Sequence, residues 1–154
     1  MRDRWRVIGA LAAALFAVNV AARLVIKFAF PDDDPTADRV SLVMFLVIGL
    51  ILAGVAFRRG TTRPLAEWST DLAAAVGVAL ALTVLVGPLL VGDNPFGGGA
   101  GLFFAQIWLY LAAALAGVAI GYLLLTALGR DYRSQQLKRY AEIKAAKPRR
   151  VVRR

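Results

Sequence analysis

Three polar residues recur at every fourth position in an apolar stretch near the start of the chain, namely Asn19, Arg23 and Lys27. This spacing places them on one stripe of a helix. If the helix crosses a membrane, its buried charge is expensive and marks a functional site, here for a lipid phosphate or an acidic partner. The alternative is that both cations extend outward to the Asp32–Asp34 cluster. Lys27 is shallow enough for that explanation, whereas Arg23 lies deeper.

A second polar pair, Gln106 and Tyr110, is also spaced by four in an apolar stretch. At 1.5 Å per residue, Gln106 lies about 6 Å and Tyr110 about 12 Å below the outer end of their helix. The same count places Arg23 about 10 Å below the outer end of its own helix. We therefore expect Arg23 to turn toward Gln106 and Tyr110, forming one polar site with Asn19 and Lys27.

Catalytic chemistry has little support in the composition. The chain contains no Cys and no His, which excludes disulfides and metal sites built from thiolate or imidazole ligands. It also removes the commonest general base. Carboxylate, Tyr and Lys remain, but neither paired carboxylates nor a nucleophile with a neighbouring base is evident. We expect a protein that is not an enzyme and that carries no cofactor or metal.

The elements that must position these residues are long apolar helices. Hydrophobic residues make up 59% of the chain, above the roughly 45–50% of globular proteins. Residues 40–57, 72–92 and 94–129 carry no charge, and the stretch from Val7 is apolar as far as Phe30 apart from the stripe. A membrane core about 30 Å thick needs roughly 20 such residues. The sequence predicts an all-α integral membrane four-helix bundle in residues 1–129, with helices at about 7–30, 40–57, 72–91 and 102–128.

Charge predicts the orientation of the bundle. Sixteen of the nineteen basic residues lie in segments 1–6, 58–71 and 130–154, whereas the other connections carry aspartates. Basic loops remain in the cytoplasm, so both termini should be cytoplasmic, in a multi-pass protein of the bacterial plasma membrane. The competing interpretation is that residues 1–22 form a cleaved signal peptide. Apolar residues continue beyond that site, which favours a spanning helix.

Small residues every four positions predict close helix contacts, either inside the bundle or with another subunit. The third helix should also kink at Gly87-Pro88. The packing residues expected on the third and fourth helices are Ala73, Gly77 and Ala81, and Ala113, Gly117 and Gly121.

The segment 130–154 reads as a basic cytoplasmic tail that is partly helical and then disordered. Its last residues are polybasic and should contact anionic lipid headgroups at the cytoplasmic face. No nucleic-acid motif with interleaved aromatic residues accompanies this charge. The residues expected to contact lipid are Lys147, Arg149, Arg150, Arg153 and Arg154.

These features favour a non-enzymatic accessory or assembly subunit of a membrane complex. Such a protein would meet another membrane protein through its helix faces and lipids through its tail. The alternative is a lipid-handling or small-solute transport component in which Arg23 binds an anion. An Arg23 that points into the bundle beside a polar cavity would favour the alternative.

Overall fold

Helices make up nearly all of the computed structural model, which describes residues 2–30 and 33–146. The protein is 87% helical, and no strand occurs among the described residues. Four of its helical segments are long and apolar enough to cross a membrane, which confirms the predicted all-α class and the number of spanning segments. The elements are α1 (Arg2–Ala29), α2 (Asp34–Gly60), α3 (Leu65–Ala81), a π-helical segment (Leu82–Val86), α4 (Gly87–Leu90), α5 (Gly99–Ala127) and α6 (Tyr132–Ala146).

The second helix begins well before the uncharged stretch that predicted it, because local capping and not hydropathy sets its start. The Asp33 side chain accepts a hydrogen bond from the backbone N–H of Thr36 at 3.2 Å, and Pro35 occupies the first turn. Both features stabilise a helix N-terminus. In the same way α3 begins directly after Pro64, so charged residues that hydropathy assigns to a loop lie in a helix.

The third spanning segment is continuous but changes its hydrogen-bond pattern before Pro88. Proline has no N–H to donate and its ring crowds the preceding turn. The chain adapts through the π-helical residues Leu82–Val86, and the Gly87 N–H donates to the Leu82 carbonyl five residues earlier. Insertion of a π-helical turn is a recognised cause of a helix irregularity. This segment lies directly before Gly87-Pro88, where the sequence predicts a kink, and Gly87 is buried against Arg23.

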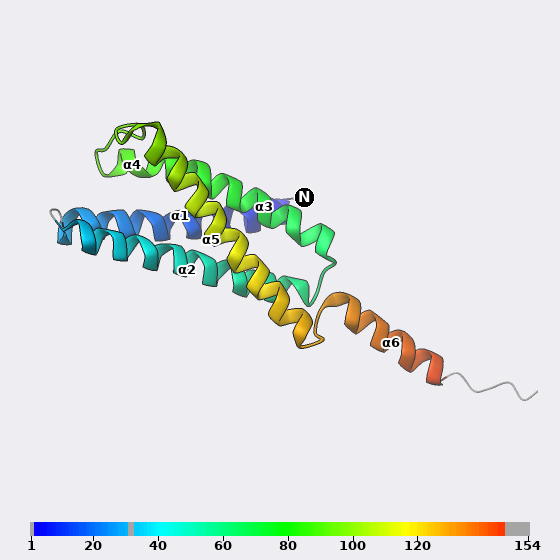
Figure 1. The fold of residues 1–154 in the computed structure, drawn as a ribbon. Coiled ribbons are helices and arrows are strands. Elements are labelled where there is room, and N and C mark those ends of the chain that lie inside the picture. Colours follow the sequence, from blue (N-terminus) through cyan, green and yellow to red (C-terminus); the bar gives the residue numbers. More distant parts are fainter. Residues whose placement is uncertain (1, 31–32, 147–154) are drawn as a thin grey trace, which may run out of the picture.

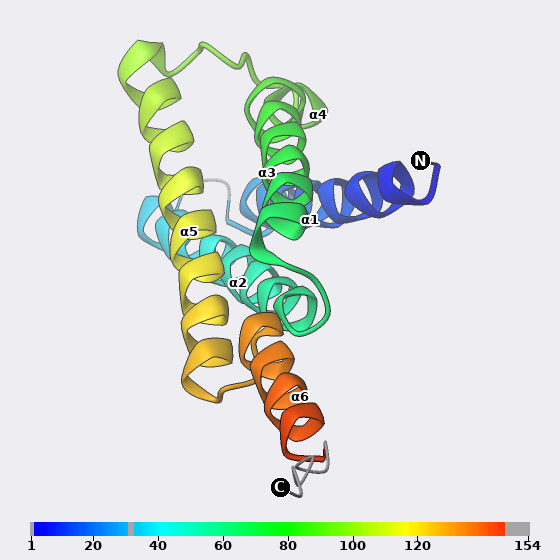
Figure 2. The same cartoon turned by 90° about the vertical axis from the view of Figure 1, so that its right-hand side faces the viewer.

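The most extensive helix contact is between α2 and α5, and α1 lies between α2 and α3. Figures 1 and 2 show α5 crossing α2, and α3 packs mainly on α1. A Cβ at Gly117 would lie 2.7 Å from the Gly49 Cα, and one at Gly121 would lie 2.7 Å from the Ala53 Cα. Only glycine permits this approach of two backbones. The α2–α5 contact therefore fixes the position of α2 relative to α5. Helix α2 in turn extends to both ends of the molecule.

A glycine turn separates α5 from α6. Gly129 has a φ of 61°, and the Arg130 N–H donates to the Leu125 carbonyl at 3.2 Å, the pattern that ends a helix at a left-handed residue. Gln135 then donates to the Thr61 carbonyl at 3.3 Å, which ties the start of α6 to the α2–α3 turn. The residues beyond this helix that were expected to contact lipid, Lys147, Arg149, Arg150, Arg153 and Arg154, lie outside the described residues.

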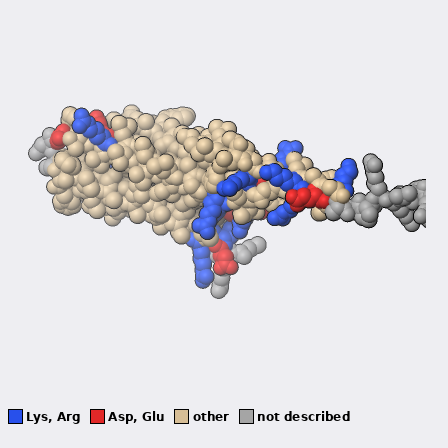
Figure 3. Space-filling view, turned by 90° about the horizontal axis from the view of Figure 1, so that it is seen from below, with Lys and Arg blue, Asp and Glu red and all other residues tan. Residues whose placement is uncertain are grey.

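Charged side chains lie mainly at the two ends of the molecule. In the face seen in Figure 3 the middle is uncharged, most Lys and Arg lie toward the end that carries α6, and a smaller charged group lies at the opposite end. We call these the basic end and the loop end. The basic end contains the start of α1 and the α2–α3 turn, and the loop end contains the connection from α4 to α5. The fold thus separates two polar regions by an apolar middle.

Candidate anion-binding site

The polar stripe of α1 is organised around Asn19, which is only 1% exposed. Its Nδ2 donates to the Met44 sulfur of α2 at 3.1 Å, and its Oδ1 accepts a hydrogen bond from Arg23 Nε at 3.0 Å. A buried amide needs partners for both of its ends. The Asn19 amide therefore has one hydrogen-bond partner on α2 and one on α1. Its bond to Arg23 Nε holds the guanidinium in place.

Arg23 is half-buried and lies against the glycine that follows the π-helical segment. A Cβ at Gly87 would lie 3.1 Å from Arg23 Nε and 3.6 Å from its Cδ. The missing side chain at this position gives the arginine its space. Within the described part of the chain, no acceptor forms a hydrogen bond or ion pair with the two terminal nitrogens of Arg23. The guanidinium is held at one nitrogen and available at the other two.

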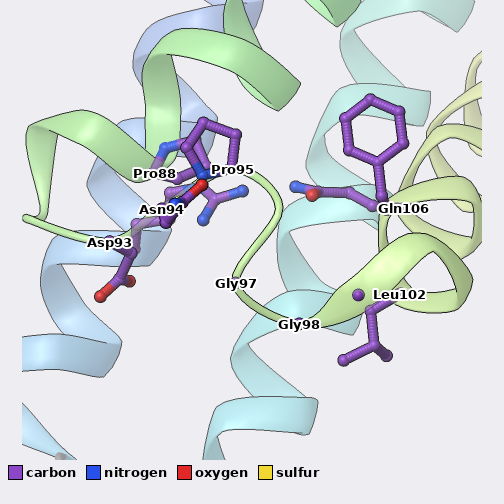
Figure 4. Close-up of a pocket in the computed structure, with 11 residues that line it drawn as sticks. Pro88, Asp93, Asn94, Pro95, Gly97, Gly98, Leu102 and Gln106 are labelled. Carbon is purple, nitrogen blue, oxygen red and sulfur yellow. The ribbon is translucent and has the colours of Figure 1, made fainter.

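Two cavities of about 350 Å³ each meet at this arginine. Arg23, Leu102 and Gln106 line both of them. Figure 4 shows the first cavity, where the Gln106 side chain points across the opening toward the side on which Asn94 lies, and the Gly97–Gly98 backbone closes one edge. Gln106 therefore joins Arg23 and Asn19 at one site, although neither of them forms a direct hydrogen bond with it.

Each cavity also contains one carboxylate. Asp93 lines the first cavity and Asp38 lines the second. Neither forms an ion pair with Arg23 in the described residues. The site is therefore a cation flanked by two separated carboxylates. Its guanidinium can donate hydrogen bonds to an anion, and its carboxylates attract a cationic or hydroxyl group.

Lys27 lies one stripe position after Arg23 and has a different environment. Its Nζ donates to the backbone carbonyl of Val91, just beyond α4. A cation at this position satisfies a free carbonyl at a helix C-terminus and interacts favourably with the helix dipole. Among the described residues, neither cation is paired with Asp33 or Asp34, and Asp32 lies outside them. The structure thus gives Lys27 a local capping role and separates it from the cavities.

Tyr110 is also separate from the cavities. It is fully buried in the apolar cluster that contains Leu15, Ile48 and Ala114. Its hydroxyl has no hydrogen-bond partner within the described residues. Because α2 lies between α1 and α5, the phenol packs in the core below the site. Of the five residues expected to act together, Asn19, Arg23 and Gln106 meet.

The two rows of small residues have different surroundings. On α5, Gly117 and Gly121 are buried against α2, and the Ala113 carbonyl lies 3.4 Å from the position of a Cβ on Gly49. On α3 the row is exposed, and a Cβ at Gly77 would meet nothing within 4 Å. The residues of that exposed row are Ala73, Gly77 and Ala81. The neighbouring small residues of α3, at 75 and 79, are the buried ones.

A second polar cluster, at the basic end, was not expected from the sequence. The Asp71 side chain is 6% exposed and pairs with Arg4 Nε at 2.5 Å and with Arg59 Nη1 at 3.8 Å. It joins three helices, α1, α2 and α3. Hydropathy assigned Asp71 to a loop, but it lies three residues after buried Trp68 and four before buried Ala75. That helical spacing is the signal that would have found it.

Comparison of the chain with known protein families, curated proteins and solved structures finds no match. The fold and the site define its class by themselves: an all-helical protein with four segments suited to crossing a membrane. Its candidate site is an arginine that lines two cavities and has one of its three nitrogens hydrogen-bonded within the described residues.

Proposed function

We propose that this protein is a non-enzymatic membrane protein that binds the anionic group of a lipid or small solute through Arg23. The observation that carries the proposal is the placement of Arg23: Asn19 holds its Nε, the residue lines two cavities, and its two terminal nitrogens have no protein acceptor in the described residues. A guanidinium pairs with phosphate or carboxylate through two parallel hydrogen bonds. A half-buried cation that lines two cavities favours this function over an accessory role without a ligand.

The two carboxylates narrow the chemistry of the ligand. Asp93 and Asp38 each lie in one of the cavities that Arg23 lines. A ligand with two adjacent negative charges would be repelled by the nearer carboxylate. A ligand that carries a cationic or hydroxyl group beside its anion would be attracted at both points. A zwitterionic phosphodiester headgroup and a small amino acid both have this chemistry.

The distribution of charge supports an orientation for this site. We place both termini and the α2–α3 turn in the cytoplasm of a bacterial cell, because these segments carry sixteen of the nineteen basic residues and basic loops are retained on that side. Arg23 then lies in the outer half of the plasma membrane. The basic tail would contact anionic lipids of the inner leaflet.

Introduced cysteines test the orientation directly, since the chain has none of its own. In intact cells, an impermeant thiol reagent should label Asp34→Cys and should not label Thr62→Cys. Lysed cells should show labelling of both variants. Labelling of Thr62→Cys alone in intact cells would reverse the orientation.

Ligand retention tests the proposed function. The full chain is purified in mild detergent, and bound lipids and solutes are identified by mass spectrometry from the wild type, Arg23→Gln and Lys27→Gln. Loss of one charge-assisted pair should reduce retention of the anionic ligand about tenfold or more in Arg23→Gln. Lys27→Gln should retain it, because Lys27 lies at the Val91 carbonyl. Equal retention by all three proteins, or no anionic ligand in the wild type, would refute the proposal.

An apolar groove between α3 and α5 supports a second function, that of an accessory or assembly subunit. Helices α3 and α5 touch little, and an apolar groove of about 350 Å³ lies between them, lined in part by Ala73, Gly77 and Leu115. A small-residue surface allows the close approach of another helix. A photoreactive residue at Gly77 should crosslink to one membrane protein in cells, whereas crosslinks to lipid alone would count against this function.

A further inference from the structure

A cavity larger than either of the two at Arg23 lies at the basic end. Its volume is about 810 Å³, and it is bounded by α1, the end of α2, the α2–α3 turn and α3. Its lining combines arginines from two helices and the turn with apolar residues of α1 and α2. We call the charged and polar lining residues the rim and the apolar ones the wall. The rim residues are Asp3, Arg4, Arg58, Arg59, Thr62, Arg63 and Asp71, and the wall residues are Val7, Ala10, Leu11 and Val55.

The arginines of this rim are only partly neutralised by the protein. Asp71 uses one carboxylate oxygen for Arg4 and the other for Arg59. Asp3, the other carboxylate, lies 3.6 Å from Arg6, which is outside the lining. In the described part of the chain, Arg58 and Arg63 have no carboxylate within ion-pair distance, and both are exposed. The cavity therefore has two guanidiniums available to a ligand and two others fixed in place by a buried carboxylate.

The apolar wall decides the kind of anion that fits. Val7, Leu11 and Val55 line the same cavity as the arginines and belong to segments suited to crossing a membrane. A free phosphate ion would leave this wall uncovered. A phospholipid would place its phosphate at the rim and its glycerol and upper acyl chains against the wall, so that both surfaces are covered at once.

We propose that this cavity is a binding site for the phosphate of an anionic glycerophospholipid. Arg58 and Arg63 contact the phosphate, and Asp71 acts as a positioning residue that holds Arg4 and Arg59 at the rim. The site goes beyond the function assigned to Arg23, since it lies at the opposite end of the molecule and shares no residue with it. It also differs from general attraction of the tail to a charged surface, because it is a formed cavity.

The experiment compares two double variants that remove the same charge from the same end. Arg58→Gln with Arg63→Gln removes the available rim arginines. Arg130→Gln with Arg139→Gln removes two exposed arginines that do not line this cavity. Each full-length protein is placed in phosphatidylcholine nanodiscs, and retention of added short-chain phosphatidylglycerol is measured by native mass spectrometry after thermal unfolding has confirmed that the variant is folded.

Retention should fall about tenfold or more in the rim variant, from the loss of two basic contacts, and should change little in the control variant. The same two double variants are also compared in an Arg23→Gln background, where the loss in the rim variant should persist because the two sites share no lining residue. Equal losses in both double variants would show general charge attraction and overturn the proposal. Displacement by millimolar inorganic phosphate would instead assign the cavity to a soluble anion, and a wild type without preference over phosphatidylcholine would refute it outright.

Discussion

The two polar clusters, which lie at opposite ends of the molecule, differ in how completely the fold pairs their charges. At the basic end, both oxygens of the Asp71 carboxylate pair with arginines from two other helices. At the loop end, Arg23 has one nitrogen bonded to Asn19 and two without an acceptor in the described residues. The carboxylate is neutralised by the fold, whereas the guanidinium is only positioned by it. The first arrangement is suited to joining helices and the second to binding a ligand.

This difference has an energetic consequence. Removing one partner of a paired buried charge leaves the remaining charge uncompensated, which strongly destabilises a fold. Removing a charge that the fold has not paired relieves a desolvation cost instead. Substitution of Asp71 should therefore lower mainly the stability of the fold. Substitution of Arg23 should lower mainly the binding of a ligand.

The largest effect should come from disturbing the helix contact on which both clusters depend. Gly117→Val places side-chain atoms where the Gly49 backbone already lies, since even a Cβ would be 2.7 Å from the Gly49 Cα. Two backbones cannot yield as a side chain can, so we expect a loss of about 3 kcal/mol in the free energy of unfolding. Denaturant unfolding in detergent, followed by circular dichroism, measures it.

The matched control is Gly77→Val, the same substitution at an open position of α3, where a Cβ meets nothing within 4 Å. It should stay within about 0.5 kcal/mol of the wild type. Similar losses in both variants would mean that valine itself, and not the α2–α5 contact, is responsible. In Gly117→Val, ligand retention at both clusters should fall together, because α2 contributes to each.

The next largest effect should come from Asp71→Asn. The amide keeps the shape but loses the charge opposite Arg59, whose side chain is 19% exposed. We expect a loss of about 2 kcal/mol in the free energy of unfolding, below the value for a fully buried pair because Arg4 is 59% exposed. Glu67→Gln, an exposed position on the same helix, should change stability little. A stable Asp71→Asn would show that the two arginines are satisfied without it.

The all-helical class and the four helices suited to crossing a membrane were predictable from the sequence because they depend on long apolar stretches. The helix ends were less accessible. Asp33 and Pro64 begin α2 and α3 through local capping and backbone geometry, which mean hydropathy does not register. Asp71 was missed for this reason: a charge was taken as the end of a membrane segment, whereas here it continues the buried face of a helix.

The candidate site was predictable only in part. The spacing of four residues predicted that Asn19 and Arg23 lie side by side, because both belong to one helix. Counting residues from the outer end of the helix placed Gln106 at a depth similar to that of Arg23. Such a count carries no information about which face of a helix a residue occupies. Tyr110 is on the same helix at a similar depth, yet it packs into the core with Leu15 and Ile48. The rotation of α5 depends on its glycine contacts with α2, which are a property of the folded pair.

Arg23→Leu should reverse the pattern of Asp71→Asn. It removes an incompletely paired charge from a spanning segment, so the free energy of unfolding should stay within about 0.5 kcal/mol of the wild type or rise, even though Asn19 loses one partner. Anion retention should nevertheless be lost. Lys27→Leu serves as the control, and it should keep the ligand. A strongly destabilised Arg23→Leu would place Arg23 with Asp71 as a structural charge and remove the contrast between the clusters.

The smallest effect concerns Asp131, which is partly exposed and belongs to neither cluster. Hydrogen bonds from the Ser134 side chain and backbone lower the pKa of Asp131 below its ordinary value of 3.8, and the backbone bond is 3.1 Å long. A lowered pKa means that the folded state favours the ionised form. The capping contribution to α6 is therefore complete above pH 3.8 and declines as the pH falls through the lower folded value. Amide hydrogen exchange of Ser134 in the full chain, corrected for its intrinsic pH dependence, should show protection that decreases in this acidic range. Asp131→Asn should remove that pH dependence while leaving both ligand sites unchanged. The same pH dependence of protection in the wild type and in Asp131→Asn would show that α6 is held by its contact with Thr61 and not by its cap.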